Sequence, residues 1–330
     1  MKPVKLLNLL LGVTFLPLTA CGQLPEQKAS ITVVDQDGKP VAGASVGMGF
    51  DVGPGKTGFG TETTTKRTDT QTDGRVAISG GSTTGYIGVG ARKEGYYEAH
   101  TTFQAKSAKT GRWEPWNPEI KLVLKQKRNP VAMYGFTVGR DFNPNALPIP
   151  LVCLQTPLGF DLLKHDWVAP HGKGVVADVV ISFEEGGFDG IKKTKFEFQG
   201  GKNGIQVWRG EDGGSAFKGP HEAPVEGYAS TMEFPNRYQM RDEGRIEEIA
   251  KMPRFFMFRI RTVLDSKGTI VSALYGKLDR SPNAMRVKER FFFDQLSYSV
   301  NPDPRSRNLE CDPTKNLFTD LDKGNWPTEP

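Results

Sequence analysis

Hydrophobic and polar residues alternate with a period of two in several short segments, and this alternation limits the chain's possible folds more than any other feature. The pattern recurs at residues 195–198, 256–261 and 296–300. Successive side chains of a β-strand point to opposite faces, so a period of two is typical of antiparallel sheet with one wetter face. Only residues 240–252 have the pattern of a short helix, and Gly244 is expected to mark its start. The chain is therefore predicted to be mostly β.

Composition supports this fold class and excludes one class of partner. The chain has 330 residues, of which 38 are glycine and 23 are proline, a mixture that suits a loop-rich β protein of about two domains. Its formal net charge is +5, and Lys2 and Lys5 in the first segment account for two of those charges. So weak a basic excess argues against nucleic acid as a partner.

The first 21 residues have the organisation of an export signal. Lys2 and Lys5 precede an almost wholly apolar run at 6–16, and Leu18-Thr19-Ala20-Cys21 follows. This ending resembles the lipobox of bacterial lipoproteins, which implies that residues 1–20 are removed and that Cys21 is acylated. The alternative is an ordinary secretory signal that is cut near Ala20.

Acylation would decide where the chain resides. No later segment is long and apolar enough to cross a bilayer, so lipid on Cys21 would be the anchor and residues 21–29 a tether. We expect a lipid-anchored protein of the bacterial cell envelope. Gly22, rather than aspartate, follows the cysteine, and resemblance to sorted lipoproteins then implies the outer membrane if the host has two membranes.

Acylation of Cys21 would leave two cysteines, Cys153 and Cys311. An even pair in an oxidising compartment predicts one disulfide. The alternative is two buried free thiols, because cysteine often serves as a small core residue.

Residues 30–125 contain a series of strand and turn signals. The matching positions are Asp35, Gly38, Pro40, Val41, Gly43, Ala44 and Val46, then Thr72, Asp73 and Gly74, then Lys93, Gly95 and Tyr96. This series resembles the carboxypeptidase regulatory-like domain, which implies an immunoglobulin- or transthyretin-like β-sandwich. The chain departs from that pattern in having no residue between Asp73 and Gly74. Within the same region, residues 86–91 alternate glycine with bulkier residues.

The remainder of the chain is divided by its prolines. Residues 126–150, which end in a proline-rich run, are predicted to be a linker. Residues 151–305 are predicted to form a second, antiparallel β-rich domain with the one short helix, and residues 306–330 an extended tail.

Residues 159–174 hold the densest group of polar residues that could carry chemistry. Asp161, His165, Asp166 and His171 are the types used as general bases and orienting groups. They lack any recognised metal spacing, so no metal or cofactor is expected. The alternative is a turn in which the aspartates accept hydrogen bonds from backbone amides and Trp167 packs in the core.

Trp113 and Trp116 lie close together in a proline-bearing segment. Two tryptophans could form a platform for a sugar ring or a peptide. The alternative is a loop that folds back and seals the contact between the domains. From these features we expect a non-enzymatic envelope protein that binds a glycan or another envelope protein. The alternative is a hydrolase of an envelope polymer that acts through residues 159–174.

Overall fold

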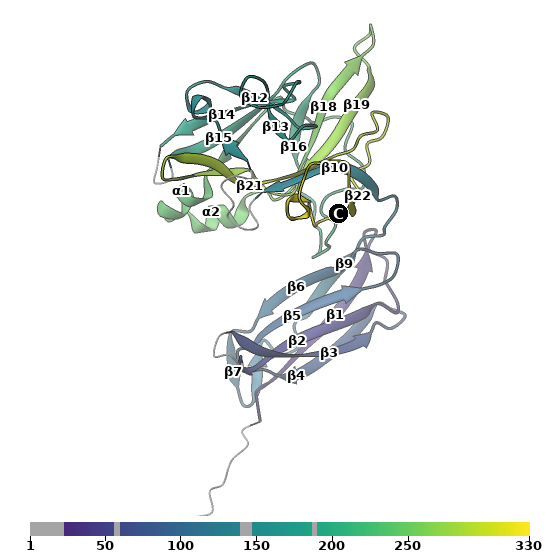
Figure 1. Ribbon diagram of the computed structural model, residues 1–330. Coiled ribbons are helices and arrows are strands. Elements are labelled where there is room, and N and C mark those ends of the chain that lie inside the picture. Colours follow the sequence, from purple (N-terminus) through teal and green to yellow (C-terminus); the bar gives the residue numbers. More distant parts are fainter. Residues whose placement is uncertain (1–22, 56–59, 139–146, 187–189) are drawn as a thin grey trace, which may run out of the picture.

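The computed structural model describes residues 23–55, 60–138, 147–186 and 190–330. They form two β units, one above the other in Figure 1, and the short helices α1 and α2 lie in the second unit. The predicted fold class, mostly β with antiparallel sheets, is confirmed. No helix among the described residues is long and apolar enough to span a membrane. The signal segment and Cys21 lie outside the described residues, so acylation stays a prediction.

The first unit is a sandwich of two sheets. In one sheet β1 (Glu26–Asp35) lies between β4 (Arg75–Gly81) and β9 (Glu119–Leu124), and the short hairpin of β7 (Ser107–Lys109) and β8 (Arg112–Glu114) continues from the start of β1. The other sheet has the order β3-β2-β5-β6, with bounds Thr61–Asp69, Ser45–Pro54, Tyr86–Arg92 and Ala99–Gln104. Alternate side chains of both sheets, among them Ile31, Phe50 and Leu122, fill the core between them.

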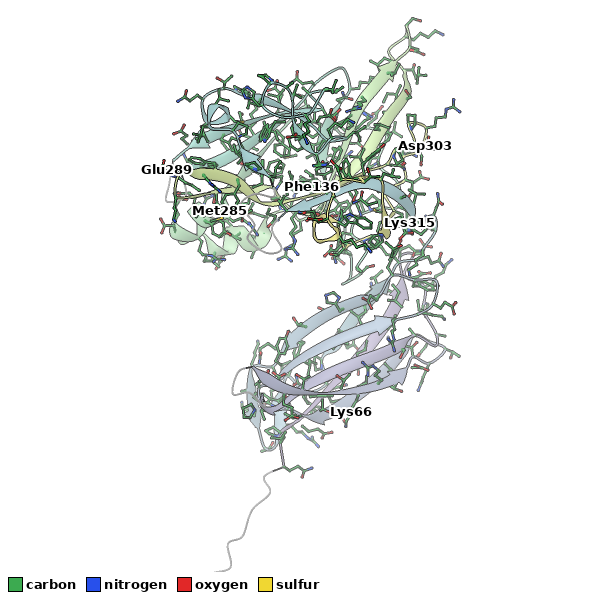
Figure 2. The ribbon with its side chains drawn as sticks, in the orientation of Figure 1. Lys66, Phe136, Met285, Glu289, Asp303 and Lys315 are labelled. Carbon is green, nitrogen blue, oxygen red and sulfur yellow. The ribbon has the colours of Figure 1, made fainter. Side chains whose placement is uncertain are left out.

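The second unit contains an eight-stranded and a five-stranded sheet. The larger has the order β16-β18-β19-β21-β10-β22, and β11 (Pro148–Ile149) and β20 (Asn283–Val287) also pair with β21 (Arg290–Val300). Its other strands are β16 (Gly204–Val207), β18 (Phe256–Leu264), β19 (Ile270–Leu278), β10 (Val131–Val138) and β22 (Cys311–Asn316). The smaller sheet has the order β13-β12-β14-β15-β17, with bounds Asp166–Trp167, Leu158–Asp161, Val179–Glu185, Ile191–Phe198 and Thr231–Pro235. An aromatic-rich core that includes Phe136, Trp167 and Tyr298 joins the two sheets, and Figure 2 labels Phe136 within it.

The linker predicted at 126–150 and the tail predicted at 306–330 are both wrong in part. Strand β10 lies inside the first segment and β22 inside the second, and the two strands pair in parallel. Pro130 directly precedes β10 and Gly135 lies within it, and both residue types are typical of a linker rather than of a strand. Position 135 requires glycine because Pro327 packs against its backbone, and a Cβ there would lie 2.9 Å from the proline ring. The second unit therefore uses both segments as parts of its fold.

The single helix predicted at 240–252 is divided into α1 (Arg237–Asp242) and α2 (Ile246–Lys251). Asn236 caps α1 by accepting hydrogen bonds from the amides of Tyr238 and Gln239. Gly244 was expected to mark the helix start, and this is wrong, because it lies between the two helices with a φ of +73°. This left-handed conformation suits the residue just after a helix end, so Gly244 stops α1.

The predicted disulfide between Cys153 and Cys311 is not formed, because both side chains are buried free thiols. Cys153 lies in a short 3₁₀ turn, Leu151–Leu154, and its Sγ is 3.5 Å from the carbonyl oxygen of Ile181 on β14. Cys311 begins β22, opposite Val131 of the larger sheet. Each thiol thus packs as a small core side chain in its own place.

The two units meet at the end of the sandwich where β9 leaves it. The phenolic oxygen of Tyr97 donates to the Glu310 carboxylate at 2.8 Å, and Lys125 Nζ lies 2.7 Å from Asp212 Oδ1. The backbone amides of His100 and Val123 donate to the carbonyls of Gly214 and Gly213. Residues 212–216 of the second unit are therefore held against strands β6 and β9 of the first unit by backbone hydrogen bonds and an ion pair.

Candidate functional site: a glycine face on the first domain

The outer face of strands β2 and β5 lacks side chains at its centre. Strict alternation places Val46, Met48 and Phe50 of β2 in the core, so the intervening Gly47 and Gly49 face outward. On β5 the same alternation buries Ile87, Val89 and Ala91 and turns Gly88 and Gly90 outward. We call Gly47, Gly49, Gly88 and Gly90 together the glycine face.

These glycines are paired across the two strands. Gly47 lies opposite Gly90, and Gly49 lies opposite Gly88. The neighbouring strands extend both rows, since Arg67 of β3 pairs with Gly47 and His100 of β6 pairs with Gly90. The two rows across the sheet are therefore Arg67–Gly47–Gly90–His100 and Thr65–Gly49–Gly88–Thr102. Polar side chains thus stand on both sides of a bare strip of backbone.

Neither backbone conformation nor internal packing requires glycine here. None of the four has a positive φ. A Cβ built on Gly88 would meet nothing within 4 Å, and one on Gly47 or Gly90 would make only ordinary contacts at 3.6 Å. Only Gly49 is tighter, at 3.3 Å from Thr63 Cγ2. Glycine in a strand interior destabilises it by about 0.5–1 kcal/mol relative to alanine, and it often marks a place where a ligand approaches the backbone closely.

The glycine face is the floor of an open groove of about 440 Å³. Its rim includes Thr65, Arg67, Arg92, Glu98 and His100. The side chains of Arg67 and Arg92 form no hydrogen bond or ion pair with another described residue, so their donors face the solvent. With two guanidinium groups and one carboxylate, the rim has a basic balance. Such a groove suits a flat, hydroxylated and negatively charged ligand.

The four candidate catalytic residues of segment 159–174 do not form one cluster, because each makes its own contacts with different parts of the second unit. Asp161 is buried and accepts hydrogen bonds from the amides of Leu163, Val175 and Val176. It also pairs with Arg261 at 2.9 Å. The Asp166 carboxylate accepts from the amides of Trp167 and Lys173. Both aspartates therefore hold the turn in place through backbone amides.

The two histidines of this segment have other neighbours. His165 has a φ of +45°, and its Nε2 lies 3.1 Å from Asp320 Oδ2. Its ring stacks on Phe136 at a centroid distance of 5.4 Å. His171 is exposed on the turn. The structure therefore gives neither histidine a hydrogen bond to Asp161 or Asp166. Nor does it bring together three potential metal ligands anywhere in its described part.

Trp113 lies on β8 and pairs with Ala108 of β7, the strand labelled in Figure 1 at the end of the sandwich away from the second unit, and Trp116 follows two residues after β8. In the sheet register, Arg112 of β8 lies opposite Glu26 at the start of β1. Trp113 Nε1 donates to the carbonyl of Ser82 at 2.9 Å, and the guanidinium of Arg112 lies 4.8 Å from the ring centre of Trp116. The alternative in which this loop seals the contact between the domains is therefore wrong.

The comparisons with known proteins leave the function open. No protein-family model matches the chain. The comparison with curated proteins found no match either. The solved structures that are similar to it at low identity include 3-chlorocatechol 1,2-dioxygenase from Rhodococcus opacus 1CP, the TIE protein of Bacillus anthracis, and BcpA, the major pilin subunit of Bacillus cereus.

The matches are partial and weak. The dioxygenase is 14% identical with a TM-score of 0.23, over 32% of this chain and 62% of its own. The TIE protein is 9% identical with a TM-score of 0.21, over 89% of this chain and 50% of its own. The pilin subunit is 11% identical with a TM-score of 0.21, over 84% and 96%. Similarity at this level has no bearing on function.

The glycine face is not among the sites that the sequence analysis predicts. The alternation at 86–91 is visible in the sequence but by itself marks only an extended segment, and the matching Gly47 and Gly49 lie about 40 residues earlier. The signal that could have found them is the shared spacing in Val46-Gly47-Met48-Gly49-Phe50 and Ile87-Gly88-Val89-Gly90-Ala91. Two strands with glycine at every second position predict a bare face if they become neighbours.

Proposed function

We propose that this chain is a non-enzymatic, lipid-anchored protein of the bacterial cell envelope that binds an acidic polysaccharide on the glycine face. The observation that carries the proposal is the pairing of Gly47 with Gly90 and of Gly49 with Gly88 on the floor of a groove, where among the described residues only side chains of β3 lie close to Gly47 and Gly49. Glycine at these four positions lowers the stability of the sheet, and close approach of an external ligand to the backbone would explain why glycine is present there.

Chemistry on the rim indicates the kind of polymer. Sugar rings are flat enough to lie on bare backbone, and their hydroxyl groups can bond to Thr65 and Glu98. Arg67 and Arg92 can each bind a carboxylate through two parallel hydrogen bonds. An extended chain of uronic-acid units would present both features to the groove. Tyr86, 41% exposed on the same face of β5, offers an aromatic surface for a further ring.

The hydrolase alternative has less support. Its residues, Asp161, His165, Asp166 and His171, make the separate contacts described above, and both aspartates are engaged by backbone amides. A general base must lie within hydrogen-bond reach of the group that it serves. We therefore favour binding over catalysis.

The experiment is a calorimetric titration of the purified chain with polygalacturonate and with the same polymer after its carboxylates are reduced to alcohols. We expect the acidic polymer to bind, and to bind more weakly as salt is raised, because the rim charges are exposed to solvent. The neutral polymer should bind at least tenfold more weakly. Equal binding of both polymers, or of neither, would overturn the proposal.

Variants locate the binding. Replacing both Arg67 and Arg92 by glutamine should weaken binding of polygalacturonate at least tenfold. Lys66→Gln is the matched control, because Lys66 lies on the same strand as Arg67 (Figure 2) but its Nζ donates to the carbonyl of Ser79. If the control and the double variant lose binding equally, the glycine face is not the site.

The anchor has its own test. Cys21→Ser removes the atom that would be acylated, so the variant should leave the membrane fraction. A variant that fractionates with membranes as the parent chain does would contradict anchoring by lipid, while leaving the binding proposal standing.

A further inference from the structure

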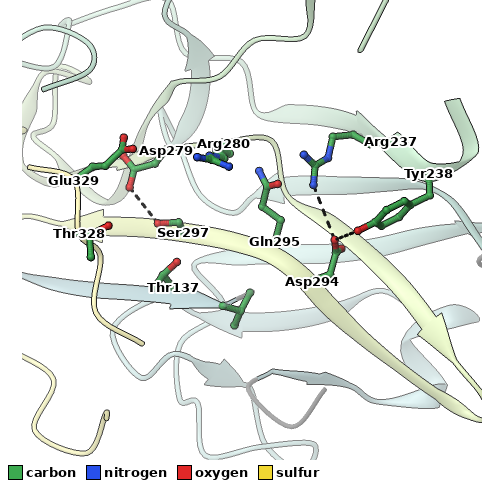
Figure 3. A pocket seen from close by; sticks show the side chains of 11 residues that line it. Thr137, Arg237, Tyr238, Asp279, Arg280, Asp294, Gln295, Ser297, Thr328 and Glu329 are labelled. Carbon is green, nitrogen blue, oxygen red and sulfur yellow. Dashed lines mark hydrogen bonds and ion pairs between the residues drawn. The ribbon is translucent and has the colours of Figure 1, made fainter. Parts of the chain in front are cut away.

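A second cavity lies in the second unit, and it shares no lining residue with the groove of the glycine face. It has a volume of about 330 Å³ and is lined by side chains from α1, β10 and β21, from the two residues that follow β19, and from residues 328–329 (Figure 3). A water molecule occupies about 30 Å³ of liquid, so the cavity has room for roughly ten waters or one small organic molecule. Its lining carries charges of both signs, from Arg237, Arg280, Asp279, Asp294 and Glu329.

Asp279 has an unused hydrogen-bond acceptor on this cavity. The residue is 9% exposed, and its Oδ2 accepts from the hydroxyl of Ser297 at 3.1 Å. Its Oδ1 is buried and has no hydrogen-bond partner among the described residues. The nearest cation is Lys277 Nζ at 3.9 Å, which is too far for a hydrogen bond. Burial raises the pKa of Asp279 because it disfavours the charged carboxylate. A donor from a ligand would satisfy this oxygen.

Two guanidinium groups supply unused donors nearby. Arg280 is exposed at the cavity and makes no hydrogen bond to any described residue. Arg237 Nε is buried without a partner in the described part of the chain, and its Nη2 is 4.0 Å from Asp294 Oδ2. In Figure 3, Gln295 stands between these two arginines. A planar carboxylate matches the donor fork of either guanidinium.

Asp294 differs from Asp279 in that its own bonds are complete. Its Oδ1 accepts from Asn283 Nδ2 at 2.8 Å, and its Oδ2 accepts from the hydroxyl of Tyr238 at 3.0 Å. Asp294 therefore holds one wall of the cavity, while Asp279, Arg237 and Arg280 remain available to a ligand.

We propose that this cavity binds a free α-amino acid. The carboxylate of the ligand would accept hydrogen bonds from Arg280 and Arg237, and its ammonium group would donate to Asp279 Oδ1. A simple anion would be repelled by three carboxylates in the lining, and a simple cation by two guanidinium groups, so the mixed lining fits a zwitterion best. The inference does not depend on the proposed function, because it concerns another domain and other residues.

The test is a titration of the purified full chain with each of the twenty L-amino acids. Binding is measured by calorimetry and by the change in melting temperature. At least one should bind. The N-acetyl derivative of that amino acid lacks the ammonium group and its amide lacks the carboxylate, so each should bind at least tenfold more weakly. Failure of all twenty to bind, or equal binding of either derivative, would overturn the proposal, and so would tighter binding of inorganic phosphate.

Two variants place the ligand in this cavity. Arg280→Gln changes an exposed side chain and should weaken binding at least tenfold with an unchanged melting temperature of the free protein. Asp279→Asn keeps an acceptor for Ser297 but removes the charge, and it should weaken binding by a similar factor. Arg305→Gln, a change of an exposed arginine outside the cavity, is the control. Unchanged binding in both cavity variants would refute the site.

Discussion

Gly47 on β2 and Gly90 on β5 lie directly opposite each other at the centre of a sheet, and both are half-buried, with the Thr65 and Arg67 side chains of the neighbouring strand beside Gly47. Gly49 and Gly88 form the adjacent pair. A glycine in a tight turn is explained by its φ, and a glycine under a ring by the close approach. Gly47, Gly88 and Gly90 have neither explanation, and Gly49 has only a contact of 3.3 Å with Thr63 Cγ2, so the pairing is the feature of this fold that most clearly requires something outside the chain.

Alanine at position 88 should make the protein more stable. Because a Cβ there meets nothing within 4 Å, Gly88→Ala should raise the free energy of unfolding by about 0.5–1 kcal/mol, measured by urea denaturation. Gly74→Ala is the contrasting control. Its φ is +74° and its Cβ would lie 2.5 Å from the carbonyl oxygen of Val33, so it should destabilise the chain. A destabilised Gly88→Ala would mean that the strand itself needs glycine.

Loss of Asp161 should destabilise the second domain strongly. Asp161→Ala leaves three backbone amides without their acceptor and removes one of the two carboxylates that contact Arg261. Removing one partner of a buried ion pair typically costs about 3–5 kcal/mol. Asp166→Asn, which alters a half-buried cap, should cost about 0.5–2 kcal/mol. Denaturation curves of the two variants would contradict this ranking if Asp166→Asn were the more damaging.

Both described cysteines should be present as protected thiols. Burial raises the pKa of Cys153 to about 12 and also raises the pKa of Cys311, so little reactive thiolate forms at neutral pH. Iodoacetamide should modify neither residue in the native protein and both after unfolding without reductant, as read by mass spectrometry. A peptide that links Cys153 to Cys311 would show that the disulfide forms after all.

Acid should weaken the fold through His221 at the contact between the domains. Its Nε2 lies 2.7 Å from the carbonyl oxygen of Gln126, and burial lowers its pKa below the ordinary 6.5. Below about pH 6.5 the unfolded chain binds a proton that the folded chain does not, so the free energy of unfolding falls as the pH drops. Buried carboxyls with raised pKa, such as Asp294, act in the opposite direction.

A comparison with His221→Gln isolates the histidine from those carboxyls. The difference in melting temperature between the parent chain and this variant should be larger near pH 7.5 than near pH 5.5. A difference that stays constant over this range would show that His221 does not titrate on unfolding.

The sequence predicted what depends on local alternation and missed what depends on register. Period-two patterns give the strands and the β class, because burial on one face acts on each strand separately. The parallel pairing of β10 with β22 joins Val131 to Cys311, and no local pattern reports a contact over that separation. The expected disulfide failed for the same reason, since counting cysteines says nothing of where each one packs.

The candidate site shows the same limit. Turn chemistry around Asp161 and Asp166 was foreseeable, because aspartate near glycine commonly caps backbone amides. Its partner Arg261 was not, because it lies 100 residues further along the chain. The glycine face required the register of β2 against β5, and a shift of one strand by one residue would have turned that strand's two glycines toward the core.

The most direct test of the account is an NMR titration of the ¹⁵N-labelled full chain with oligogalacturonate. Backbone amide signals of Gly47, Gly49, Gly88 and Gly90 should shift together with those of Arg67 and His100, in proportion to the fraction bound. Signals from the distant Trp113 hairpin should stay in place. Shifts confined to Trp113 and Trp116, or to the second domain, would contradict a binding role for the glycine face.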